Sequence, residues 1–543
     1  MCVDIYFYTH KLTVPSLKHV VGVAPKADIL KLFALARKVG TFVLTDKRAD
    51  PESSISSGSY IRLAQLQTPG TPLFPSLKRL RIDHADASLD RLNLLITDSL
   101  RFLEVINIDE SQHSVLLLFL FALAKECPHL TSITLSPAQK GWLIAPCLRF
   151  RHLRRLQLDG IVPGFYFKEL VAIGQALPEL ETFILDAETN DYDPRVPTFP
   201  FEIDGACEFF ISDPRAANGI QEPVGATMGV SPEGQEQTKT SDLGPSDDHT
   251  LQDGATSRPT SPTKDTPPLS KSTFWQLRKL HIVGCLELIR DLVSLCSGLE
   301  DTSLTLVRYD ESPGPDTTAD IFTSIIEEIL SSTEDKRLTR LFIRQRCKVE
   351  DSSESGLSTL PPILPSRAVE KMLLHPTLEH LEISDWTLES TATCLSCLAP
   401  GPLRFKSKLT TLVLPVGTIN AGIKLSELRY LALSCPDLVS LQSTIVLDLQ
   451  NLPPYGFGRA ADGALSHNLK TLSVGSQAGY DWSWSLRETL TTARHLFVLF
   501  PALQNIQTHQ GQYESRWVNT RTLFLVCQTA CLDNNARSSA SVR

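Results

Sequence analysis

Cys394 and Cys397 are the residues whose spacing points most directly to chemistry, because they form the only Cys-x-x-Cys pair of the chain. Such pairs serve in zinc sites and in thiol–disulfide exchange. A structural zinc site needs four ligands, and no second Cys pair or His-x-x-x-His follows this one at zinc spacing. We therefore favour buried, reduced thiols, with a metal or redox role as the alternative.

The acidic stretch from Asp186 to Asp193 offers the oxygen ligands that calcium prefers. The calcium loop of an EF-hand needs Gly at its sixth position, where this stretch has Asp191, and a closing Glu, which is missing. The phosphate loop, the serine nucleophile turn and the zinc-protease helix motif are also missing. We expect no catalytic residue, no cofactor, no metal and hence no enzyme.

A third set of residues could recognise a protein partner. Arginine binds carboxylates and phosphates with a two-pronged fork, and an aromatic ring can anchor an interface. The candidate protein-binding residues are Arg79, Arg81, Arg155, Gln157, Lys279, His281, Arg340, Phe342 and Arg344. The alternative is that they are ordinary solvated strand residues whose aliphatic stems cover an apolar sheet.

These candidates gain their common orientation from a recurring phrase, exemplified by Cys127 to Leu135. It reads as a small or aromatic residue, often a Pro, any residue, Leu, two variable residues, an aliphatic, one variable residue and another aliphatic. Its recurrences begin at anchor positions that mostly lie 22 to 40 residues apart. The anchors are Leu77, Leu100, Leu130, Leu153, Leu180, Leu277, Leu299, Leu338, Leu378, Leu409, Leu438, Leu469 and Leu503.

This step is long enough for one short strand and a return helix, which is the leucine-rich-repeat unit. On a strand, the two aliphatics face one side and the residues between and beside them face the other. We therefore predict an α/β fold, an irregular leucine-rich-repeat solenoid with a curved parallel inner sheet and outer helices. Return helices are expected at 114–125, 168–176 and 318–330. The candidate binding residues then lie on the concave sheet face.

Composition divides the chain into five parts. Residues 1–73 are expected to be an N-terminal cap or degenerate first repeats, 74–212 the first part of the repeats, and 273–510 the second part. Residues 511–543 would form a C-terminal cap and a frayed tail. Residues 213–272 are rich in Pro, Ser, Thr and Gly and contain no aromatic residue from Asp213 to Ser272, so we expect a disordered insertion.

Charge and hydrophobicity limit the partners. The net charge is -9, which argues against a general nucleic-acid binder, because that function requires a basic face. The longest apolar run, Val115 to Ala124, is about half of a membrane span, so we expect a buried helix and no membrane association. No secretory signal is evident at the start. We expect a monomer, cytoplasmic or nuclear.

The phrases at Phe74 to Leu80, Cys127 to Leu130, His375 to Leu381 and Cys435 to Leu438 resemble those of the F-box/leucine-rich-repeat proteins of mushroom-group fungi. The resemblance covers roughly residues 74 to 510. It implies the substrate-recognition part of an SCF-type ubiquitin ligase. A Skp-type adaptor and a cullin are implied only with a cryptic F-box, because no Leu-Pro-x-Glu-like start lies in 1–73. The alternatives are a plain scaffold, or an enzyme or enzyme regulator on the same solenoid.

Overall fold

The computed structural model describes most of the repeat region and parts of the ends. The described residues are 4–7, 10–13, 31, 33–45, 71–83, 89–107, 113–136, 143–160, 167–187, 273–308, 315–332, 337–347, 363–390, 394–395, 397–398, 406–416, 422–452, 467–475, 484–509 and 514–541. They belong to one compact unit made of residues 1–198 and 272–543. The expected insertion at 213–272, the rejected calcium segment beyond Ala187 and much of the expected N-terminal cap lie outside the described residues.

The unit is built on a long sheet of parallel strands in which each strand pairs with the next one along the chain. The strands are β3 (Thr41–Thr45), β4 (Arg79–Asp83), β5 (Phe102–Ile106), β6 (Ser132–Ser136), β7 (Arg155–Asp159), β8 (Thr182–Asp186), β9 (Lys279–Gly284), β10 (Asp301–Arg308), β11 (Arg340–Cys347), β13 (His380–Ser384), β15 (Thr411–Val413), β17 (Ser440–Val446), β18 (Thr471–Gly475) and β19 (Asn505–His509).

Short strands extend this sheet or lie apart from it. β1 (Asp4–Phe7) and β2 (His10–Thr13) form an antiparallel hairpin, and β1 also pairs with β3. β16 (Ile423–Lys424) pairs with the end of β17. A separate pair joins β12 (Ile363–Leu364) to β14 (Thr387–Leu388).

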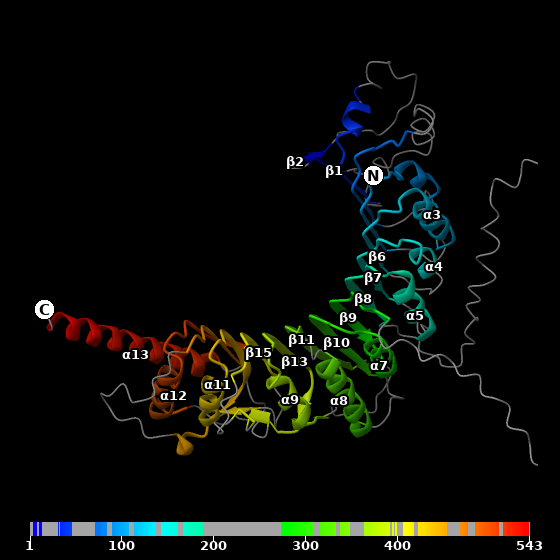
Figure 1. The fold of residues 1–543 in the computed structure, drawn as a ribbon. Helices are drawn as coiled ribbons and strands as arrows, with labels where there is room; N and C mark the ends of the chain where they lie inside the picture. The colour runs from blue at the N-terminus through cyan, green and yellow to red at the C-terminus, as the bar shows by residue number, and fades with distance from the viewer. Residues whose placement is uncertain are drawn as a thin grey trace, which may run out of the picture. The chain divides into compact units, whose positions relative to one another are not determined.

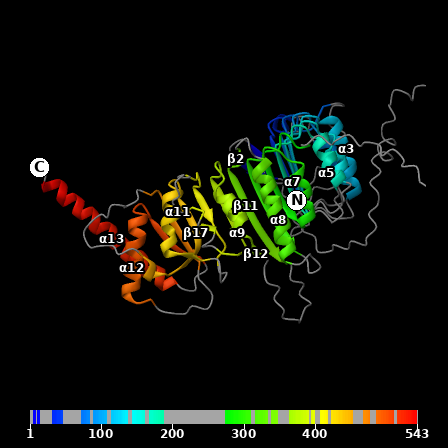
Figure 2. The ribbon, with the colours of Figure 1, turned by 60° about the horizontal axis from the view of Figure 1, so that its bottom comes forward.

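Helices cover one face of the sheet, as both ribbon views show (Figures 1 and 2). They are α3 (His113–Glu126), α4 (Ile144–Cys147), α5 (Phe167–Ala176), α7 (Leu286–Ser294), α8 (Pro315–Ser332), α9 (Ser366–Leu373), α11 (Leu428–Ser434), α12 (Leu486–Leu499), α13 (Glu514–Ser541) and the 3-10 segments η2 (Leu89–Leu95), η6 (Leu425–Glu427) and η7 (Leu449–Asn451). We call the opposite sheet face the open face. No described helix is long and apolar enough to cross a membrane.

The core lies between the sheet and the helices. All the anchor leucines predicted from the phrase are at most 2% exposed. Along β7, Leu156 and Leu158 are fully buried, while Arg155 and Gln157 alternate with them on the open face. Cys127 and Cys435 occupy the core, as their position in the phrase predicts. The pattern therefore confirms the predicted leucine-rich-repeat solenoid.

The recurring phrase also forms a turn that is held by a backbone hydrogen bond. In most of the described units the anchor Leu donates its amide to the carbonyl three residues earlier, as in Leu130 N to Cys127 O at 3.2 Å. Two units are one residue shorter at this turn, and a side chain there replaces the carbonyl as acceptor. Leu409 N donates to Ser407 Oγ at 3.3 Å, and Leu469 N donates to His467 Nδ1 at 3.1 Å. In these two shorter units the buried amide of the anchor Leu therefore stays paired.

The strands on either side of the segment that contains the expected insertion pair directly with each other, so the described sheet has no break there. The amides of Arg278 and Lys279 both donate to Glu181 O at 3.0 Å, and β8 pairs with β9 in parallel. The predicted helices at 114–125, 168–176 and 318–330 correspond to α3, α5 and α8. The β1–β2 hairpin and the full length of α13 were not predicted.

Candidate functional site

A groove of about 480 Å³ lies on the open face, over strands β7 to β13. Its floor is low because β10 carries Ser303 and Thr305, which are short side chains. The register places Ser303 between His281 of β9 and Phe342 of β11, both larger. The groove is therefore formed by the side chains that the parallel register brings side by side.

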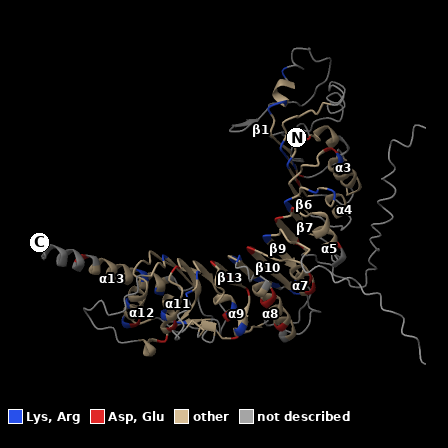
Figure 3. Ribbon diagram, viewed as in Figure 1, with Lys and Arg blue, Asp and Glu red and all other residues tan. Residues whose placement is uncertain are grey.

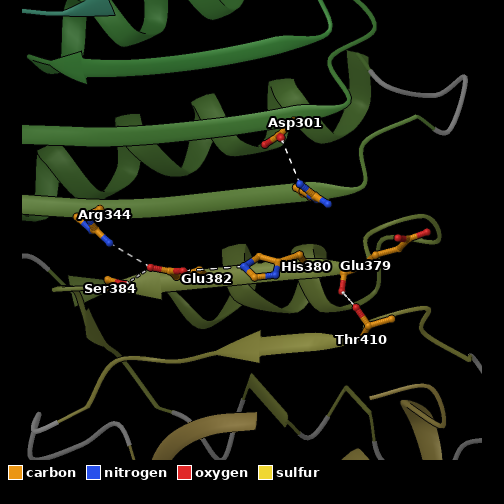
Figure 4. Close-up of polar contacts among 8 residues, drawn as sticks. Asp301, Arg344, Glu379, His380, Glu382, Ser384 and Thr410 are labelled. Atoms are coloured by element: carbon orange, nitrogen blue, oxygen red, sulfur yellow. Dashed lines mark hydrogen bonds and ion pairs between the residues drawn. The ribbon is translucent and has the colours of Figure 1, made fainter. Parts of the chain in front are cut away.

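Charged residues of both signs lie along these strands (Figure 3). Asp301 forms an ion pair with Arg340, whose Nη1 lies 3.8 Å from Asp301 Oδ2. Glu382 is held more closely, since Arg344 Nη2 lies 3.2 Å from its Oε1 and Ser384 Oγ donates to the same oxygen at 3.0 Å (Figure 4). Both carboxylates of the groove wall are thus already engaged with β11 arginines.

Phe342 of the groove wall packs against the ring of His380 on β13. Their ring centroids are 4.6 Å apart, with planes tilted by 36°. His380 Nε2 lies 3.9 Å from Glu382 Oε2, which is longer than a hydrogen bond. The neighbouring His380, the Ser384 hydroxyl and Arg344 lower the pKa of Glu382, which stays ionised.

Strand β7 carries a polar chain on the other side of the groove. Arg155 Nη2 donates to Gln157 Oε1 at 3.0 Å, and Gln157 Nε2 donates to Asp159 Oδ2 at 3.0 Å. Burial raises the pKa of Asp159, and nearby Asp186 adds to this effect. Arg155 is therefore oriented by an amide, and no carboxylate of the described residues pairs with it directly.

His281 lies half-buried between the two walls. Burial lowers its pKa, and this effect is opposed by the carboxylates of Asp186 and Asp159 and assisted by Arg344 and Arg346. Within the described residues its ring makes no hydrogen bond. The imidazole is therefore neutral near physiological pH and is open to a partner.

The structure divides the sequence-predicted binding residues into groups. Arg155, Lys279, His281, Phe342 and Arg344 line the groove. Gln157 and Arg340 contact residues of its wall.

Arg79 and Arg81 lie apart from the groove, on β4. There Arg79 covers the ring of Phe102 at 5.1 Å and Arg81 pairs with Glu104 at 3.4 Å.

Sequence reasoning missed the groove residues Thr182, Ile184, Asp301, Ser303, Thr305 and Arg346. These residues share no chemical type, so their identity alone does not indicate a binding site. The signal that could have found them was the phase, since the anchors Leu180 and Leu299 each fix a strand whose alternate residues face the groove.

The Cys394 and Cys397 thiols lie in the helical layer. Cys394 is 1% exposed, and Cys397 Sγ donates to Cys394 O at 3.0 Å. Burial raises their pKa values, to about 11 for Cys394 and about 12 for Cys397. Among the described residues no cluster of three or more His, Cys, Asp or Glu side chains could hold a metal ion.

Comparison with known proteins yields a structural match only. No family model matches the chain, and no curated protein matches it. The crystal structure of an internalin from Listeria monocytogenes aligns with 89% of this chain and 92% of its own, at 12% identity and a TM-score of 0.34.

Proposed function

We propose that this chain is a non-catalytic protein-interaction solenoid whose partner docks in the groove over β7 to β13. The observation that carries the proposal is the groove itself, in which a half-buried aromatic ring, Phe342, stands beside exposed cations on an ordered sheet. Aromatic and arginine side chains dominate the energetics of many interfaces. A rigid strand surface also presents them without a large entropic cost on binding.

The test is loss of partner retention on a face-specific change. Full-length chain carrying Phe342→Ser should lose proteins that the unmodified chain retains from a lysate. The matched control is Leu118→Ser on α3, because Leu118 is 58% exposed on the helical side. Equal retention by both variants would refute docking at the groove.

A finer form of the proposal is the substrate-recognition part of an SCF-type ubiquitin ligase. Its support is the resemblance of the repeat phrases alone. Co-purification of a Skp-type adaptor and a cullin with the full-length chain would support it. Retention of other proteins without these two would leave a plain scaffold that binds at the same groove.

A further inference from the structure

The cations of the groove follow a diagonal across the strands. Arg155 on β7 and Lys279 on β9 lie at aligned positions near the strand starts, on either side of Thr182. On β11, the residue aligned with Lys279 is Arg340. Arg344 lies four residues beyond Arg340 on the same strand, and Arg346 lies six residues beyond it. We name Arg155, Lys279, Arg344 and Arg346 the cationic diagonal.

Carboxylates border the diagonal on both sides. Asp159 and Asp186 lie at the far ends of β7 and β8, four residues beyond Arg155 and Thr182 at the strand starts. Asp301 and Glu382 lie on the opposite side and are paired with Arg340 and Arg344. An anion is therefore favoured along the diagonal and disfavoured beside it.

The members of the diagonal differ in how far they are neutralised. Lys279 is exposed and makes no ion pair within the described residues, and Arg155 bonds directly to an amide. Arg344 pairs with Glu382 at 3.2 Å and with Asp385 at 4.0 Å, and 46% of its side chain is exposed. The strand-start end therefore has the larger uncompensated positive charge, in a protein whose net charge is -9.

The length of the diagonal matches a short extended peptide. Four strand spacings of ~4.8 Å, with ~13 Å along the strand to Arg344 or ~20 Å to Arg346, separate these two backbone positions from that of Arg155 by roughly 23 Å and roughly 28 Å. About seven to eight residues of extended chain span these distances. Alternate residues of such a chain point to the same side, so they can present a row of carboxylates to the sheet.

We propose that the cationic diagonal binds an extended acidic segment of a protein partner, about seven to eight residues long, through the carboxylates of alternate Asp or Glu residues. The inference rests on the proposed function and specifies the partner that the groove accepts. Arg155 and Lys279 bind one end of the segment, over Thr182. Arg344 and Arg346 bind the other end, and Phe342 contacts an apolar residue next to it.

The test uses the full-length chain and three fluorescent octapeptides, in which Ser alternates with Glu, Gln or Lys. Fluorescence anisotropy should show the Glu peptide binding most tightly, and a Glu–Ser tetrapeptide binding more weakly. The double variant Arg155→Glu with Lys279→Glu should weaken binding of the Glu peptide about tenfold or more, because two attractions become repulsions. The control is Lys125→Glu with Arg487→Glu, which makes the same charge change on exposed residues of α3 and α12.

Preference for the Lys peptide, or equal weakening by the control pair, would overturn the proposal. Unchanged binding by the Arg155 and Lys279 pair would do the same. Circular dichroism should show that both double variants fold, since all four side chains are exposed. If Phe342→Ser abolishes partner retention while the Glu peptide fails to bind, docking at the groove stands and only the acidic chemistry is wrong.

Discussion

Burial of His495 should make the C-terminal repeats lose stability in mild acid. This side chain lies in α12, is fully buried, and its Nε2 donates to Leu425 O at 2.9 Å. Burial lowers its pKa from 6.5 to about 4, while the Leu425 carbonyl and Asp448 oppose the shift. The folded chain therefore keeps the ring neutral at pH values where the unfolded chain protonates it.

The sign and size follow from proton linkage. The unfolded state binds more protons between about pH 6.5 and about pH 4, so stability falls as the pH drops through that window. A full shift of this size corresponds to about 3 kcal/mol, and the share lost between about pH 7.5 and about pH 5 is roughly 2 kcal/mol. Above the window His495 contributes no pH dependence.

The assay is urea unfolding of the unmodified chain and of His495→Gln at both pH values. Gln retains an N–H donor for Leu425 O but does not titrate. Trp484, which precedes α12, and Trp517 of α13 have ring centroids 5.1 Å apart, so these two of the six tryptophans contribute a fluorescence signal from this region. The other buried histidines titrate in both chains and cancel in the comparison. An equal loss of stability in the two chains would refute the account of His495.

Three further outcomes are expected. Leu130→Ala should lower the free energy of unfolding by about 2–5 kcal/mol, because Leu130 is fully buried. Leu118→Ala should change it by less than about 0.5 kcal/mol, because Leu118 is 58% exposed. Equal effects of the two changes in thermal unfolding would contradict the assigned core. Ser407→Ala should cost about 1–3 kcal/mol, because Leu409 N loses its acceptor, and Ser294→Ala on the exposed side of α7 is the control. Cys127, Cys147, Cys296, Cys394 and Cys435 should react with a thiol reagent only on unfolding, since burial raises the pKa of each thiol; rapid modification of Cys394 in the native chain would revive the redox alternative.

The repeat architecture was predictable because its signal is apolar and periodic. Leu130, Ile133 and Leu135 must be buried together on one side of a short strand, and the structure places them there. The same phase gave the orientation of Arg155 and Phe342 on the open face. Burial periodicity thus fixes both faces of a strand at once.

The groove was not predictable from the same signal. It depends on Ser303 and Thr305 being shorter than their neighbours on β9 and β11, and that comparison requires the register between strands. The β1–β2 hairpin was missed because it lies outside the repeated phrase. Helix α13 was missed because Asn and Ser near its end predicted fraying.

Docking on the open face is tested most directly by photo-crosslinking within one repeat. A benzophenone side chain at Phe342 would lie in the groove, and the same group at Ser331 would lie on the exposed side of α8. A partner mixed with the full-length chain should be crosslinked from position 342 and not from position 331. Crosslinking from position 331 with none from position 342 would contradict docking on the open face.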